Sequence, residues 1–159
     1  MIGIGMGLSL GSANKGYVRR NLLDASGDIS NAAWIKTNTA SATGNVGSFP
    51  AVGDAIIQSI GQPAGIGDSA TGSAELSGSG AISLRIVRSL GGPFERTDTV
   101  VTLTGTPTWH HVTHTMVNAG QNGFTFRVIR TFTGQSTTVT VTGAQFERGT
   151  VATAYQPRP

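Results

Sequence analysis

The sequence predicts an all-β protein, built as a two-sheet antiparallel β-sandwich of the jelly-roll type. Glycine provides 23 of the 159 residues and charged residues only 12%, a composition typical of short strands joined by tight turns. Apolar and polar residues alternate in several stretches from residue 73 onward, which is the period of a strand with one buried face. We expect about eight strands in one domain, residues 17–159, preceded by an extended arm, residues 1–16.

The charge balance and the missing cysteines exclude several classes of function. The net charge is +3 with 11 basic residues, and these are scattered apart from Arg19 and Arg20. Nucleic-acid binding needs basic residues clustered on one face, so we expect no nucleic-acid partner. The absence of cysteine excludes thiol catalysis and a cysteine-based zinc site. No apolar stretch is long enough to span a bilayer.

The arm alternates large apolar residues with glycine. Such a flat, glycine-rich strand specifies its own pairing weakly, and apolar side chains left in water favour docking onto a partner. We therefore predict that the arm anchors the domain to another protein, with a frayed terminus as the alternative. The predicted contact residues are Ile2, Ile4, Met6, Leu8 and Leu10.

Four stretches in the middle of the chain predict strands. Residues 54–60 form a short strand candidate. Residues 73–88 alternate so that Ile82, Leu84 and Ile86 share one side. Residues 97–104 alternate again, with Val101 and Leu103 facing the core, and residues 108–117 follow. Before these strands, Ser30 is placed to cap a single short helical turn ahead of Trp34.

The last quarter of the chain carries the clearest strand pattern. Between residues 124 and 132 one side is apolar, and it comprises Phe124, Phe126, Val128 and Phe132. Val139 and Val141 continue the alternation, and at Gly143 its parity slips by one, which indicates a β-bulge or bend. Residues 120–123 contain Asn-Gly, the strongest hairpin signal in the sequence. We predict hairpins on both sides of the 124–132 strand.

Three segments together resemble a known family of domains. They are the opening Asn-Leu-Leu at residues 21–23 with Trp34 downstream, the strand at 108–112, and the ending at 143–157 with its Gln-Phe-Glu-Arg-Gly and Thr-Ala-Tyr. The chain is thereby similar to the carbohydrate-binding-module-like jelly-roll domains of bacteriophage virion proteins.

This resemblance implies a structural role without catalysis. It implies a capsid decoration protein, head fibre or tail-fibre module in the virion, often trimeric, with capsid, neck or tail proteins as partners. The arm, residues 1–16, would provide the attachment. The alternative that the resemblance leaves open is a glycan-binding module that aids adsorption to the host surface.

Three aromatic residues are the candidates for stacking on a sugar. They are Trp34, Trp109 and Tyr155. An aromatic face packs against the apolar face of a pyranose, so a carbohydrate site needs at least one exposed ring. The competing interpretation makes both tryptophans anchors of the core.

Other polar residues suggest sites of lower specificity. His110 and His114 share one face of a strand while His111 points away, so one chain cannot gather them around a metal; we expect them at the surface or at a subunit interface. Asp24 and Asp28 lie in one turn that could hold a structural Ca²⁺ or be a simple turn. No pair of acidic residues has a spacing that indicates a glycosidase, and we expect no cofactor.

Overall fold

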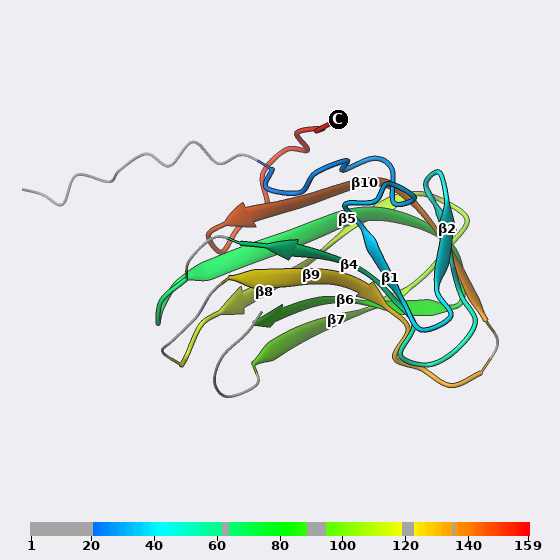
Figure 1. The fold of residues 1–159 in the computed structure, drawn as a ribbon, viewed down its shortest axis with the longest axis horizontal. Helices are drawn as coiled ribbons and strands as arrows, with labels where there is room; N and C mark the ends of the chain where they lie inside the picture. The colour runs from blue at the N-terminus through cyan, green and yellow to red at the C-terminus, as the bar shows by residue number, and fades with distance from the viewer. Residues whose placement is uncertain (1–20, 62–63, 89–94, 119–122, 135) are drawn as a thin grey trace, which may run out of the picture.

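The protein is a sandwich of two five-stranded antiparallel sheets (Figure 1), which confirms the predicted fold class. The computed structural model describes residues 21–61, 64–88, 95–118, 123–134 and 136–159. Within these ranges there are ten strands and no helix, and accordingly no helix that could cross a membrane. The predicted arm, residues 1–16, lies outside the described residues.

The first sheet, called sheet A here, has the strand order β1-β4-β9-β6-β7. All its neighbouring strands are antiparallel. Its strands are β1 (Ile35–Thr37), β4 (Ala55–Ile60), β6 (Ala81–Arg88), β7 (Arg96–Thr102) and β9 (Phe124–Ile129).

The second sheet, sheet B, has the order β2-β3-β10-β5-β8. Its two central strands are the longest of the molecule and pair with each other over ten register positions. Its strands are β2 (Ser41–Thr43), β3 (Val46–Phe49), β5 (Ser69–Ser79), β8 (Thr108–Thr115) and β10 (Thr137–Arg148).

The core between the sheets matches large side chains of one sheet with small ones of the other. Sheet A contributes Phe124 and Phe126, both fully buried. Phe126 packs against Gly72 of β5. Only glycine fits at this position, because a Cβ there would stand 2.5 Å from two ring atoms of Phe126. Phe146 of β10 packs against both phenylalanines at centroid distances of 5.7 and 6.1 Å. This aromatic cluster joins the two layers.

The predicted strand at 73–88 is in fact two strands in different sheets. The break falls at Gly78 and Gly80, whose φ angles are 143° and 91°, a backbone region that only glycine enters readily. The chain therefore leaves sheet B through β5 and enters sheet A through β6. The alternation after the break is as predicted, since Ile82, Leu84 and Ile86 are all fully buried.

Both predicted hairpins are wrong. β9 pairs with β4 and β6 in sheet A, whereas β8 and β10 belong to sheet B. The chain crosses between layers before and after β9, so residues 120–123 join strands that do not pair; of these, residues 120–122 lie outside the described ranges. Alternation reports which face of a strand is buried and carries no information about which strand lies beside it.

The register slip predicted at Gly143 is confirmed. The pairing of β10 with β5 shifts between Val141 and Gly143, and beyond it Ala144 and Phe146 turn into the core. Two smaller expectations were wrong. Phe132 lies beyond β9 and is 38% exposed. Ser30 begins no helical turn, because its amide and hydroxyl both donate to the carboxylate of Asp28 at 2.9 and 2.6 Å.

Candidate functional site

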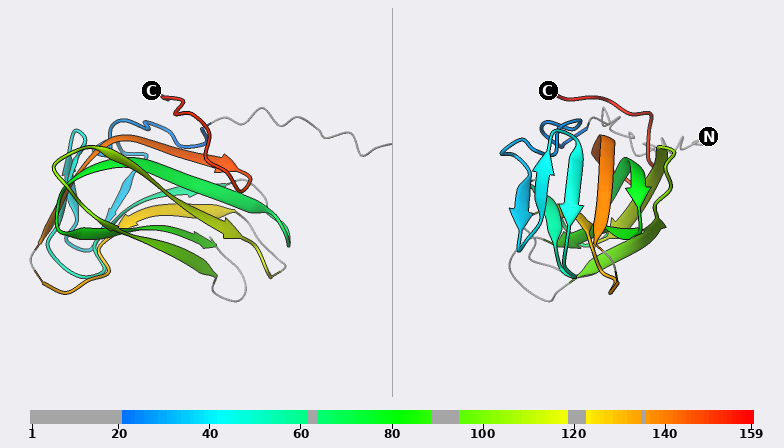
Figure 2. Two further views of the ribbon diagram at one scale, coloured as in Figure 1. Left: turned by 180° about the vertical axis from the view of Figure 1, so that it is seen from behind. Right: turned by 90° about the vertical axis from the view of Figure 1, so that its right-hand side faces the viewer.

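An exposed pair of aromatic rings lies on the outer face of sheet B. Trp109 is on β8, where Val112 faces the core and Trp109 takes the opposite side, with 41% of its surface exposed. Tyr155 comes from the C-terminal segment, which runs above β10 (Figures 1 and 2). The two ring centroids are 5.2 Å apart and the planes are tilted by 43°. We call these two residues the aromatic pair.

The bulge glycine of β10 makes room for the aromatic pair. A Cβ on Gly143 would stand 3.0 Å from Cζ of Tyr155 and 3.2 Å from Cη2 of Trp109. Gly143 and Trp109 are both partners of Glu75 on the intervening strand β5, so the indole crosses one strand to reach the glycine. A side chain at Gly143 would force one or both rings to shift by at least a few tenths of an ångström.

Buried polar side chains of β10 hold the C-terminal segment in place. The carboxylate of Glu147, which has no exposed surface, accepts hydrogen bonds from the amide of Thr153 at 2.9 Å and from its hydroxyl. The side-chain oxygen of Gln145 accepts from the amide of Gln156 at 2.7 Å. The tyrosine hydroxyl of the aromatic pair lies 3.0 Å from Oγ of Ser26. Tyr155 is thus clamped on both sides along the chain.

Polar groups surround the aromatic pair on the same face. Glu75 lies between Gly143 and Trp109 and has its carboxylate against the hydroxyl of Thr142 at 2.5 Å. The next row across the sheet pairs Ser73 with the exposed His111. The Ser73 hydroxyl is buried and has no hydrogen-bond partner within the described part of the chain. A ring face beside carboxylate, imidazole and hydroxyl groups is the combination that binds a polyhydroxylated ligand.

The third aromatic candidate is placed elsewhere. Trp34 is 1% exposed, its ring edge packs on Phe126 at 6.5 Å, and its Nε1 donates to the carbonyl of Ala25 at 3.1 Å. Both faces of this ring are covered, so it anchors the core and offers no surface to a sugar. Sequence alone could not separate the two tryptophans, because each one lies at the start of a strand: Trp34 directly precedes β1, and Trp109 is the second residue of β8.

The three histidines divide between the faces of β8 as predicted, but His114 is not at the surface. It is 6% exposed, and its Nε2 lies 3.3 Å from the carboxylate of Glu95. Its Nδ1 lies 3.0 Å from the hydroxyl of Thr97. Burial and the charge on His111 lower the pKa of His110. The two contacts of His114, with Glu95 and Thr97, hold β8 against the start of β7 at the edge of the sandwich.

The carboxylate of Glu95 accepts hydrogen bonds that hold the neighbouring backbone in place. Burial acts to raise its pKa, but hydrogen bonds donated by the amides of Val117 and Asn118, at 3.0 and 2.8 Å, outweigh burial and lower it. The carboxylate is therefore ionised at neutral pH and already holds its donors. A general acid needs the opposite shift, so the pair of Glu95 and His114 is not an acid–base site.

The acidic residues are each engaged with separate partners. Asp24 forms an ion pair with Arg158 at 3.3 Å, and Asp28 binds Ser30, so the two carboxylates of the predicted turn have separate partners. Among the described residues no three His, Asp or Glu side chains gather as metal ligands would.

Solved structures share this fold. The chain is similar to a structure of the CBM22-1 and GH10 modules of an endo-1,4-beta-D-xylanase 10B from Clostridium thermocellum, with TM-score 0.59 and 13% identity over 84% of this chain and 30% of that one. It is similar to the CBM22-1 xylan-binding domain of Paenibacillus barcinonensis Xyn10C, with TM-score 0.55 and 10% identity over 84% of this chain and 97% of that one.

A phage protein contains the same fold. The chain is similar to the enzymatically active domain of tailspike protein 4 of bacteriophage CBA120, with TM-score 0.56 and 17% identity over 80% of this chain and 21% of that one. No described protein family and no curated protein matches the sequence. At these identities the similarity establishes the fold alone, which is that of the carbohydrate-binding modules.

Proposed function

We propose that the protein is a non-enzymatic glycan-binding module whose sugar stacks on the aromatic pair. The observation that carries this proposal is the exposure of Trp109 at 41%, with Tyr155 held beside it by buried hydrogen bonds. Exposed aromatic residues are enriched at binding sites. An exposed indole that is held in place by neighbouring side chains therefore indicates a binding site. Similarity to xylan-binding domains supports the same function.

The site binds a sugar through one stacked ring and a polar rim. The apolar face of a pyranose rests on the indole of Trp109, and its hydroxyls meet the carboxylate of Glu75 and the imidazole of His111 on the same outer face. Tyr155 limits how far the sugar slides along β10. Among the residues that the structure describes, the only carboxylate that we place at this ligand is that of Glu75, so binding is the expected outcome.

The experiment is a glycan array followed by calorimetry on the best ligand, with wild type, Trp109→Ala and Gly143→Ala. We expect both variants to weaken binding by about tenfold or more, or about 1.4 kcal/mol. Trp109→Ala removes the stacking surface, and Gly143→Ala displaces it.

Phe132→Ala is the matched control for this experiment. Phe132 is also an aromatic residue exposed by 38%, but it lies beyond β9 and outside the aromatic pair. Its loss should leave affinity unchanged, and all variants should melt cooperatively. Binding of no glycan, or equal loss in Phe132→Ala and Trp109→Ala, would overturn the proposal.

A second function, as an accessory component of a phage virion, is favoured by two observations. The fold recurs in a phage tailspike domain, and the ending at residues 143–157 resembles that of virion modules. We propose that residues 1–16 attach the domain to a capsid, neck or tail protein, with a trimer as the assembly. A variant that lacks residues 1–16 should remain folded but should no longer bind to phage particles. Retention of this variant on the particle would reject this role. Light scattering of the purified protein would test the trimer.

A further inference from the structure

Two arginines lie directly opposite each other on the outer face of sheet A. Arg85 of β6 pairs in register with Arg127 of β9, the two central strands of that half of the sheet. Their side chains project outward because Leu84, Ile86 and Phe126 take the inner face. Like charges directly opposite on neighbouring strands destabilise a sheet, so an anion near either guanidinium would reduce the repulsion between them.

One of the two charges is neutralised within the protein. Asp98 of β7 is the register partner of Arg85 on its other side. Its two oxygens accept from Nε and one terminal nitrogen of Arg85 at 2.5 and 2.8 Å, the two-bonded geometry that guanidinium and carboxylate prefer. Asp98 also lies 3.8 Å from Nε of Arg96. This single carboxylate therefore serves two guanidinium groups already.

The other charge, that of Arg127, has no counterion among the described residues. Its Nε is buried and has no hydrogen-bond partner, and no ion pair joins this side chain to any described residue. Its register partner on the far side is Ile57, an apolar residue. Burial lowers the pKa of Arg127, and the neighbouring charge on Arg85 lowers it further. A partly buried charge without a counterion is costly, and an anion bound at the exposed end of the side chain would offset that cost.

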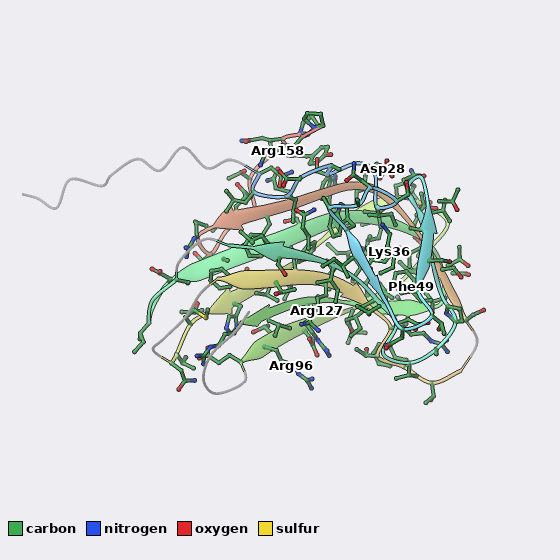
Figure 3. The ribbon with its side chains drawn as sticks, viewed as in Figure 1. Asp28, Lys36, Phe49, Arg96, Arg127 and Arg158 are labelled. Carbon is green, nitrogen blue, oxygen red and sulfur yellow. The ribbon has the colours of Figure 1, made fainter. Side chains whose placement is uncertain are left out.

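The surroundings indicate which anion fits. The Nε of Arg127 is buried, but the side chain as a whole is partly exposed. The two terminal nitrogens of a guanidinium present two parallel donors on one edge, which match the two oxygens of a carboxylate. Figure 3 shows Arg127 and Arg96 on the same side of the molecule, and Arg158 at the opposite edge. Asp98 is in contact with both Arg85 and Arg96, so the charge of Arg127 lies beside a carboxylate that already has two guanidinium partners.

The position in the sheet favours a polysaccharide over a peptide. A peptide that binds to a sheet commonly adds a strand at a free edge, but β9 is flanked on both sides by β4 and β6. The row through Arg127 crosses all five strands and begins with the aliphatic surface of Ile35 and Ile57. A linear sugar chain lying across the strands would meet this aliphatic surface and then the guanidinium.

We propose that Arg127 binds the carboxylate of an acidic polysaccharide, one built from uronic acids, at a site on sheet A separate from the aromatic pair on sheet B. The site rests on the unpaired guanidinium, and the choice of a sugar as the carrier of the carboxylate rests on the proposed glycan binding.

The test is calorimetric titration with short oligomers of galacturonate, glucuronate and mannuronate, each compared with its neutral methyl ester. We expect at least one acidic oligomer to bind at least tenfold more tightly than its ester. Arg127→Gln should lose that binding at least tenfold, and Arg127→Lys should lose part of it because an ammonium group lacks the two parallel donors. Arg158→Gln removes the same charge from the opposite edge and should change affinity less than twofold.

Three outcomes separate this inference from its alternatives. Equal binding of esters and acids, or unchanged binding by Arg127→Gln, overturns it. Hexaglutamate binding as tightly as the uronates, and losing affinity in Arg127→Gln, overturns the assignment to a polysaccharide. Loss of uronate binding in Trp109→Ala but not in Arg127→Gln places the acidic sugar on the aromatic pair, which rejects this site and supports the proposed function. Arg127→Gln should melt no lower than wild type, because the charge it removes is unpaired.

Discussion

Replacing Gly72 by alanine tests the packing that joins the two sheets. The new Cβ would stand 2.5 Å from Cδ2 and Cε2 of Phe126, where ordinary contacts begin at 3.4 Å. Phe126 is fully buried and cannot retreat, because Trp34 and Phe146 lie against it at 6.5 and 6.1 Å between centroids. An overlap of this size belongs at the upper end of the roughly 1–3 kcal/mol that overpacking costs.

The expected loss follows from two opposing terms. Alanine restricts the unfolded chain and returns about 0.4–1 kcal/mol, which leaves a net destabilisation of about 2 kcal/mol. For a domain of this size that lowers the melting temperature by roughly 4–8 °C. Thermal unfolding followed by circular dichroism measures it. Gly61→Ala is the matched control, because a Cβ there meets nothing within 4 Å.

A double mutant identifies the cause of the loss. Phe126→Leu replaces the ring that the new methyl group would strike with a smaller side chain. Gly72→Ala should therefore cost at least about 1 kcal/mol less in that background. If Gly72→Ala melts at or above wild type, or costs the same with leucine at position 126, the close approach of the two sheets at this point is not what the structure indicates.

Three further predictions concern buried polar groups. Burial acts to raise the pKa of Asp54, but hydrogen bonds from Ala51 and Thr39 outweigh burial and lower it below 3.8. The stability that the ionised carboxylate contributes is present above pH 3.8 and is lost as the pH falls through the lowered pKa. Asp54→Asn should therefore weaken the pH dependence of the urea unfolding midpoint between about pH 5 and 2. Thr153→Val removes a donor from the buried Glu147 and should cost about 1–3 kcal/mol, with faster proteolysis of the C-terminal segment; unchanged proteolysis would contradict the clamp. Arg130→Met strips a donor from the carbonyls of Phe49, Phe132 and Gly134 and should lower stability by about 2–5 kcal/mol in chemical unfolding; a loss under 1 kcal/mol would argue against it.

The candidate site was only partly within reach of sequence reasoning. Trp109 and Tyr155 could be chosen as ring-bearing residues, but their contact depends on a bulge at Gly143 and on a segment folded back over β10. Arg127 could not be singled out at all. It stands out because, within the described ranges, it lacks a counterion in a sheet where Arg85 has one, and sequence does not show which charges meet.

What the sequence by itself determined is the burial of each strand face. Alternation placed Ile82, Val101 and Phe124 in the core and located the slip at Gly143, because side-chain direction along a strand is a local property with a period of two. Which strands pair was decided by the tertiary structure alone. The chain changes sheet around β9, and Trp34 is buried while Trp109 is exposed, because these outcomes depend on which distant segments cover each face, and that is settled only when the two layers close on one another.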